Sequence, residues 1–301
     1  MLYENRSICI STSYAMNSGF VASGKTVEKI WSVNAKKWKR VGSPWRPSPG
    51  DIRVYRQLVG SKLAGSTLVL GATPEIRDLV ARRVRRGRLP ILVDVNIHML
   101  ETMSQFLHRA SPTREIWVKA DWCSAPLANR SFDLIIADMV WWVISTEQQR
   151  QLAKNIARWL KSDGVFVSRF RVLDPKRKLE SSARIIASYL ERFRKEPHRA
   201  RAIRDAMVSH LHDVTADRHT RRIQRARTRH ALIAAAARTR DRRDREFILE
   251  ATRWLTGADW TCQTLPEIIA TIRPHLLMIQ RRCSDDYDST GYPIIKFEVK
   301  A

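Results

Sequence analysis

Cysteine is rare in this sequence, and long apolar runs are missing. The four cysteines, Cys9, Cys123, Cys262 and Cys283, form no C-x-x-C pair, and no histidine stands at zinc-ligand spacing from them. We therefore expect reduced thiols in a cytoplasmic protein, and no bound metal. No stretch approaches the roughly 18 apolar residues that a membrane span requires. Residues 1–24 also lack the apolar segment of a secretory signal, and we expect a flexible tail there.

Acidic residues are scarce as well. The chain has 30 Asp and Glu against 54 Lys and Arg, so its formal net charge is +24. A charge of this size favours acidic partners, such as nucleic acid or phosphorylated molecules. It is not evidence of sequence-specific recognition, because an arginine-rich codon bias would produce the same excess.

A strand–helix–strand pattern lies near the start of the chain. The apolar run Ser66–Leu70 predicts a buried strand that Gly71 ends, and Thr73-Pro74-Glu75 predicts the start of a helix. The next apolar run, Ile91–Val95, carries one acid, Asp94. This acid follows Gly71 by about 20 positions, which is typical of a carboxylate that binds ribose hydroxyls in a βαβ nucleotide-binding unit.

Glycine is missing where a dinucleotide-binding loop needs it. Gly71 is followed by Ala72, Thr73 and Pro74, so the G-x-G-x-x-G pattern is absent. Those glycines allow the backbone to approach a pyrophosphate closely. The loop therefore favours S-adenosylmethionine, which has no pyrophosphate, over NAD or FAD.

These features resemble the first two motifs of class I S-adenosylmethionine-dependent methyltransferases, in a branch whose loop reads LGATPE. The phrase S-F-D-L-I-I-A-D at Ser131–Asp138 resembles the fourth motif of that family, and a helix, D-G, then an apolar strand follow it. The resemblance spans about residues 45–175 and 260–301. It implies an α/β, Rossmann-like fold with a seven-stranded, mostly parallel sheet and helices on both faces.

The expected organisation has five parts. They are a tail (1–24), an N-terminal helical arm (25–60), a cofactor-binding core (61–173), an inserted helical lid (174–255), and a C-terminal helix with the closing strands (256–301). Within the arm, Ser48 and Asp51 form a predicted capping box. Strands beyond the βαβ unit are expected at 115–122, 134–138, 165–172, 277–282 and 294–299.

The resemblance also implies a cofactor site. Gly71, Ala72 and Thr73 would face the methionine part of S-adenosylmethionine, and Glu75 its ammonium group. Asp94 and the backbone of Val95 would face the ribose.

Asp121 and Trp122 would contact the adenine, since an amine needs an acceptor and a flat ring an apolar wall. The alternative is that Asp121 caps the next turn and Trp122 packs in the core.

The reacting centre is expected after the fourth strand. Asp138 would lie there as a catalytic acceptor or base, or would only order the loop. Trp141 and Trp142 would form an apolar wall for the substrate, although core packing explains at least one of them equally well. Methyltransferases that act on nucleic-acid bases often carry a proline-aromatic tetrapeptide here, and this chain reads D-M-V-W instead.

The segment 174–255 interrupts the alternation of strands and helices. It is rich in Arg and His, has no glycine up to residue 250, and predicts several amphipathic helices. We expect a helical lid over the substrate crevice. Its arginines form either a solvated surface or a groove for an acidic partner.

Four functions follow from the sequence. The favoured one is methyl transfer from S-adenosylmethionine to a small molecule. The alternatives are cleavage or cyclisation of the cofactor, an RNA-directed methyltransferase that uses the basic surface, and a degenerate, non-catalytic scaffold. The sequence gives no indication of the oligomeric state.

Overall fold

The computed structural model describes residues 38, 41–82, 88–174, 180–217, 219–252, 255 and 260–300. The expected tail and the first part of the N-terminal arm, up to residue 37, lie outside the described residues. None of the helices in the described part is long and apolar enough to cross a membrane.

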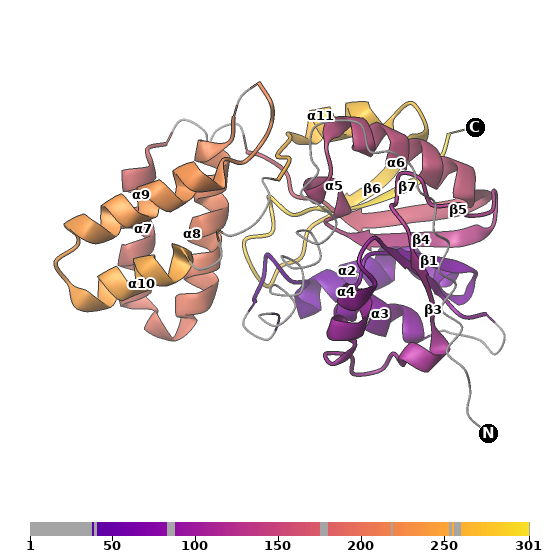
Figure 1. Ribbon diagram of the computed structural model, residues 1–301, viewed down its shortest axis with the longest axis horizontal. Helices are drawn as coiled ribbons and strands as arrows, with labels where there is room; N and C mark the ends of the chain where they lie inside the picture. The colour runs from indigo at the N-terminus through magenta and orange to yellow at the C-terminus, as the bar shows by residue number, and fades with distance from the viewer. Residues whose placement is uncertain are drawn as a thin grey trace.

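A seven-stranded sheet forms the centre of the molecule, with the strand order β3-β2-β1-β4-β5-β7-β6 (Figure 1). Strands β1 to β5 run parallel, whereas β7 is antiparallel to both β5 and β6. This mixed sheet confirms the predicted fold class. The strands are β1 (Thr67–Leu70), β2 (Ile91–Asp94), β3 (Ile116–Lys119), β4 (Phe132–Asp138), β5 (Leu160–Arg169), β6 (Leu276–Arg282) and β7 (Ile294–Val299).

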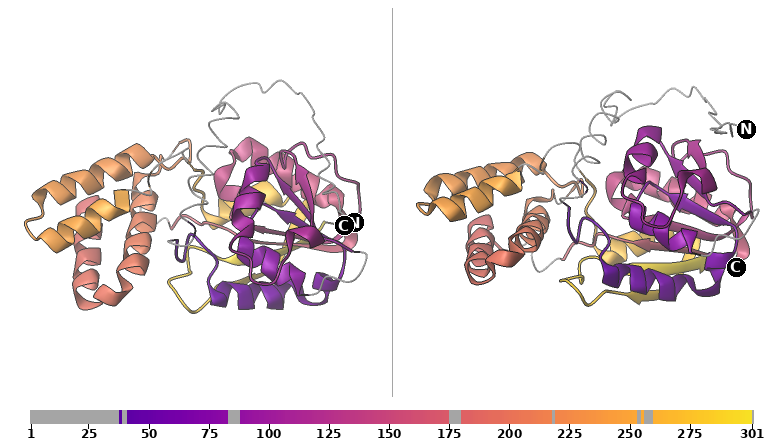
Figure 2. Two further views of the ribbon diagram at one scale, coloured as in Figure 1. Left: turned by 60° about the horizontal axis from the view of Figure 1, so that its bottom comes forward. Right: turned by 90° about the horizontal axis from the view of Figure 1, so that it is seen from below.

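Helices cover both faces of the sheet, as predicted (Figure 2). One face carries α2 (Pro49–Val59), α3 (Pro74–Ala81) and α4 (Ile97–Ser104), and the other carries α5 (Val140–Val143), α6 (Thr146–Trp159) and α11 (Leu265–Ile272). Short 3-10 turns lie at Gly60–Ala64, Pro112–Arg114 and Pro197–Arg199. Each face of the sheet therefore has its own apolar core, which is why β1 and β4 are apolar on both sides.

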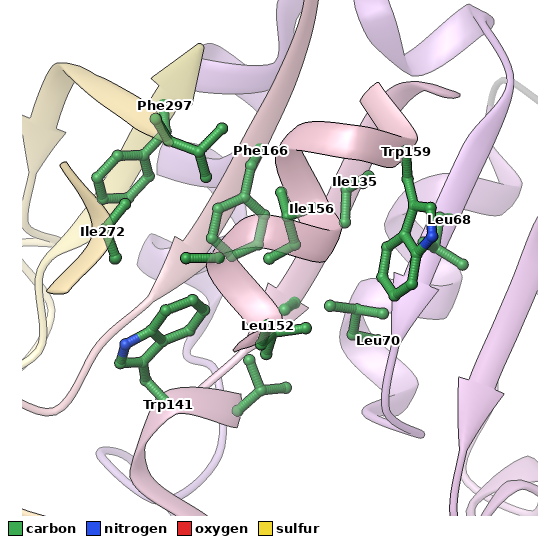
Figure 3. Packing of buried hydrophobic residues seen from close by; sticks show 14 of the residues in the cluster. Leu68, Leu70, Ile135, Trp141, Leu152, Ile156, Trp159, Phe166, Ile272 and Phe297 are labelled. Atoms are coloured by element: carbon green, nitrogen blue, oxygen red, sulfur yellow. The ribbon is translucent and has the colours of Figure 1, made fainter. Parts of the chain in front are cut away.

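The core beneath α6 is built from large side chains. Trp159 and Phe166 are fully buried, and Phe166 stacks on Phe297 with 5.8 Å between ring centroids. Figure 3 shows these rings together with Leu68 of β1 and Ile272 of α11. Side chains from β1, β5, β7, α6 and α11 thus fix the central strands in one layer.

The fifth strand differs from the expectation. It begins at Leu160, directly after α6, and ends at Arg169, earlier than the predicted Val172. The residues 162–164, expected as a turn, continue the strand past a register shift in β4. A Cβ atom on Gly164 would lie 2.8 Å from the carbonyl oxygen of Phe132, so only glycine fits this close approach.

A second lobe lies beyond the carboxyl ends of β4 and β5 (Figure 1). It consists of α7 (Ser182–Lys195), α8 (Ala200–Thr215), α9 (Arg225–Arg238) and α10 (Arg242–Thr252). These helices bury a core of their own, in which Phe193 and Phe247 stack with centroids 4.2 Å apart. The arginine-rich segment is therefore a helical lobe with its own packed interior.

We expect Leu68→Ala to lower the free energy of unfolding by about 2–5 kcal/mol, because Leu68 is fully buried in β1 and its loss leaves a cavity. Leu277→Ala is the matched control, since Leu277 of the edge strand β6 is 41% exposed. Urea unfolding followed by circular dichroism measures both. Equal losses in the two variants would contradict this account of the core.

Candidate functional site

The order of the strands points to one place for a ligand. The sequence order reverses between β1 and β4, which lie side by side and run in the same direction. Ligands of open α/β sheets bind outside the carboxyl ends of the strands at such a switch point. The loops after β1, β2 and β4 therefore form the candidate site.

The loop after β1 turns at Gly71. Its φ angle is +96°, which glycine adopts readily and other residues avoid. Ala72 follows, and Thr73 occupies the N-cap position of α3 without the side-chain hydrogen bond that the sequence suggested. Pro74 opens the helix as predicted. The loop thus uses one glycine for its conformation and exposes the amino end of α3 toward the switch point.

Asp94 ends β2 beside this loop. Its side chain is 8% exposed, and its Oδ1 accepts a hydrogen bond from the backbone N of Asn96 at 2.9 Å. No cation pairs with it among the described residues. Burial raises the pKa of Asp94 from 3.8 to about 6. The neighbouring Val95 is 42% exposed, so a partly titratable carboxylate stands beside an open backbone segment.

Glu75 lies in the first turn of α3 and pairs with Arg46, a residue that the sequence did not single out. Only Oε1 of Glu75 is engaged, and the buried Oε2 has no partner among the described residues. Burial raises the pKa of Glu75, and the charge of Arg46 opposes this rise. One acidic oxygen and one guanidinium therefore lie together at the start of α3.

Asp121 and Trp122 follow β3, which ends at Lys119. The Oδ1 atom of Asp121 accepts a hydrogen bond from the backbone N of Cys123 at 2.8 Å, so this side chain caps the turn. Trp122 donates its Nε1 hydrogen to the carbonyl oxygen of Val93 at 2.8 Å, and its ring lies 3.9 Å from a Cβ placed on Gly71. These contacts match the structural alternative for both residues, while Trp122 still borders the loop after β1.

Asp138 does not face open space. Arg169 donates from Nε to Oδ1 at 2.8 Å and from its NH2 group to Oδ2 at 3.1 Å, and Tyr55 donates to Oδ1 at 3.3 Å. The side chain is 4% exposed. These bonds favour the alternative that Asp138 orders the loop, because the guanidinium of Arg169 holds both of its oxygens, and a catalytic role for Asp138 stays a prediction.

The same guanidinium reaches a second carboxylate. Arg169 also donates to Oδ2 of Asp51 at 2.7 Å, and both side chains are fully buried. Asp51 completes the predicted capping box with Ser48. The hydroxyl of Tyr55 donates to the carbonyl oxygen of Ala137 and accepts from the backbone N of Arg169. Helix α2 is thereby fixed to the carboxyl ends of β4 and β5.

Trp141 is a core residue. It is 2% exposed and packs against Phe166 and Phe170, with centroids 6.0 and 5.6 Å away. Figure 3 shows its ring pointing into the apolar layer near Leu152. These contacts match the alternative of core packing for Trp141, and its role as a wall for the substrate stays a prediction.

Trp142 instead points away from that core toward the helical lobe. It stacks on Trp45 and contacts Trp260.

Sequence patterns missed four residues that shape this region: Trp45, Arg46, Arg169 and His212. Arg169 was detectable as a charged residue at the end of an otherwise apolar strand. The other three carry no local signal, because the loop before α2 and the helix α8 meet the sheet only in the folded chain.

Comparisons with known proteins support this reading of the fold. A family model described as a methyltransferase domain matches residues 77–168, the segment from α3 to β5. The strand order and the loop after β1 agree with the motifs quoted above. The matched segment, which is less than half of the chain, is similar to methyltransferase domains. The branch with an LGATPE-type loop stays a prediction.

Solved structures resemble the fold of this chain over most of its length. The CcbJ methyltransferase from Streptomyces caelestis is 11% identical, covers 89% of this chain and 96% of its own, and gives a TM-score of 0.51. A putative zinc-dependent alcohol dehydrogenase from Rhodobacter sphaeroides is 14% identical, covers 94% and 100%, and gives 0.54. At such identities these matches establish the fold alone. A search of the curated proteins finds no match.

We expect Arg169→Met to lower the free energy of unfolding by about 3–5 kcal/mol, because it leaves two buried carboxylates without their cation. Arg53→Met is the matched control, since the Arg53–Asp285 pair is exposed and should contribute less than about 1 kcal/mol. Chemical unfolding measures both. A loss for Arg169→Met no larger than for Arg53→Met would contradict the role given to Arg169.

We expect Asp94→Asn to stabilise the protein at pH 7.5 by an amount on the order of 1–3 kcal/mol. The folded-state pKa of about 6 lies above the ordinary value of 3.8, so the wild type loses stability as the pH rises from about 4 to about 6. The gain should nearly vanish at about pH 3, which lies below both pKa values, because Asp94 is then protonated in both states. Urea unfolding at the two pH values measures this, and an equal effect at both would contradict it.

Proposed function

We propose that this protein transfers a methyl group from S-adenosylmethionine to a small molecule. The observation that carries the proposal is the buried Asp94 carboxylate at the carboxyl end of β2, next to the switch point and without a cation partner among the described residues. Ribose hydroxyls are donors that such a carboxylate would accept.

The charged side chains at the start of α3 fit the amino-acid end of the cofactor. The amino-acid end of S-adenosylmethionine carries an ammonium and a carboxylate. The unpaired Oε2 of Glu75 suits the ammonium, and the guanidinium of Arg46 suits the carboxylate. The loop Gly71, Ala72 and Thr73 would lie along this end, since it precedes α3 directly. A zwitterion would thus meet an opposite charge at each end.

The adenine pocket has no free hydrogen-bonding side chain assigned to it. Asp121 and Trp122 are occupied in hydrogen bonds to Cys123 and Val93, so we assign them the edge of the adenine pocket rather than its hydrogen-bonding partners. The backbone of Val95 remains assigned to the ribose side, next to Asp94. Asp138 supports this site through Arg169 and carries no assigned step.

The cofactor supplies a methyl group on a sulfonium, which is already a good leaving group. The protein then has to hold the acceptor in line with the methyl carbon and exclude water. The closed layer of side chains at the carboxyl ends of β4 and β5 is suited to that task. A small-molecule acceptor and a cytoplasmic location are parts of this proposal, as the sequence suggested.

The decisive measurement is calorimetric titration with S-adenosylhomocysteine. We expect binding to the wild type and a loss on the order of 1.5–3 kcal/mol, about 10- to 150-fold in affinity, for Asp94→Asn. Asp163→Asn is the control, because Asp163 is 71% exposed at the opposite end of β5.

The pH dependence adds a second readout. Affinity of the wild type should fall below pH 6, where Asp94 takes up a proton, and Asp94→Asn should lack this dependence. If the wild type binds no S-adenosylhomocysteine at millimolar concentration, the proposed function is wrong.

A further inference from the structure

Three tryptophans and one histidine meet between the sheet and the helical lobe, and we name Trp45, Trp142, Trp260 and His212 the indole junction. Trp45 stacks on Trp142 with centroids 4.9 Å apart and an interplanar angle of 16°. Trp142 and Trp260 are 4.0 Å apart. The imidazole of His212 stands edge-on to Trp45 and Trp260 at 5.6 and 5.8 Å.

The indole junction lies at the substrate side of the proposed cofactor site. Trp142 belongs to α5, which follows β4 directly at the switch point, and its backbone carbonyl accepts from Thr261 at 2.9 Å. Trp45 directly precedes Arg46, the partner of Glu75. The same segment of chain therefore contacts both the start of α3 and the indole junction.

His212 has an unusual environment. It is fully buried in α8, yet neither of its ring nitrogens has a hydrogen-bond partner among the described residues. The Nε1 atom of Trp142 is likewise buried without a partner in that part of the chain. Buried polar groups are normally paired, and exceptions require an explanation such as a missing ligand.

Two buried arginines surround this histidine. The guanidinium of Arg225 lies over the ring of Trp260, 3.3 Å from its centroid, and Arg171 pairs with Asp213, the residue after His212. Burial lowers the pKa of His212 well below its usual value, and Arg225 and Arg171 lower it further. The imidazole is therefore neutral and a weak base, and one of its nitrogens is free to accept a hydrogen bond.

We propose, on the basis of the function proposed above, that the indole junction binds a planar aromatic acceptor bearing a hydroxyl group, and that His212 accepts a hydrogen bond from that hydroxyl and orients its oxygen. The tryptophan rings provide flat apolar contacts for the acceptor. The unpaired nitrogen of His212 provides the one polar contact that a hydroxyl needs, and it lies among these rings.

The surrounding charges select a hydroxyl over an amine. An aliphatic amine is a cation at neutral pH and would be repelled by Arg225 and Arg171, whereas the negative charge that develops on a hydroxyl oxygen would be stabilised by them. In the reaction the O–H bond breaks and its proton passes to water, because Arg225 and Arg171 disfavour a protonated imidazole at His212. The oxygen lone pair forms the new bond to the methyl carbon, and the electrons of the broken carbon–sulfur bond stay on sulfur.

Trp45 occupies the position of the acceptor ring in this structure. Its indole is half-buried and lies parallel to Trp142, at the edge of His212, as a planar ligand would. It comes from a loop, whereas Trp142 and His212 come from helices. An acceptor of indole size therefore enters by displacing the Trp45 ring.

Calorimetry with indole-sized probes tests the binding part. With the protein saturated in S-adenosylhomocysteine, we expect 5-hydroxyindole to bind about tenfold more tightly than indole, which lacks the hydroxyl, and than tryptamine, which is a cation. Trp45→Ala should tighten the binding of 5-hydroxyindole, because it vacates the position of the ring. His212→Asn should bind 5-hydroxyindole no better than indole.

Mass spectrometry with S-adenosylmethionine tests the chemical part. We expect 5-methoxyindole as the product, and we expect the rate to fall about tenfold in His212→Asn, because the hydroxyl loses the group that orients it, with unchanged affinity for S-adenosylhomocysteine. His210→Asn is the matched control on the same helix, since His210 faces Glu180 and lies outside the indole junction. It should keep the wild-type rate.

Several outcomes would overturn the proposal while the proposed function stands. They are tight binding of S-adenosylhomocysteine without binding of 5-hydroxyindole, a preference for tryptamine, wild-type methylation by His212→Asn, or weaker binding of 5-hydroxyindole by Trp45→Ala. If His212→Asn does not fold, the proposal is tested by Trp45→Ala and by the binding of 5-hydroxyindole, indole and tryptamine to the wild type. A wild type that fails to bind S-adenosylhomocysteine removes the proposed function instead.

Discussion

The buried guanidinium of Arg169 joins the parts of this molecule that have to stay in register for a site to exist. It lies at the end of β5 and binds Asp138 at the end of β4 and Asp51 at the start of α2. Tyr287, from the loop between β6 and β7, donates to Asp51 in the same network. Such a network is costly to bury and strongly destabilising when broken, so it fixes geometry more than it adds stability. The edge of the sheet next to the switch point is thereby held rigid.

Next to this rigid edge, the groups that we assign to ligands lack some of their hydrogen-bond or charge partners. Asp94 is buried without a cation, Glu75 has one free oxygen, and His212 has two free nitrogens among the described residues. Each of these groups raises the free energy of the folded chain, and each would be relieved by a ligand with complementary charge or hydrogen-bonding groups. Their positions agree with the proposed binding mode. The ribose and the amino-acid end of the cofactor would lie near β1 and β2, and the methyl acceptor would lie near α5.

The helical lobe is more than a cover for the sheet. Its four helices pack around their own apolar core, and the lobe meets the rest of the described chain through α8, the segment after it and the start of α9. That contact includes the indole junction, where Trp45 from the loop before α2 packs against His212 of the lobe. Because Trp45 and Arg46 are adjacent, one loop contacts both the start of α3 and the indole junction.

Local patterns were sufficient for the elements of this protein. Apolar runs, the single turn-forming Gly71 and the capping residue Ser48 specified strands and helix starts, because these depend on neighbours within a few positions. They could not assign roles to Asp138 or Trp141, whose partners Arg169 and Phe166 are distant in sequence and decide between a core and a reacting surface. The indole junction was invisible for the same reason: its members come from four separate segments, and only packing of the lobe against the sheet buries His212 beside them.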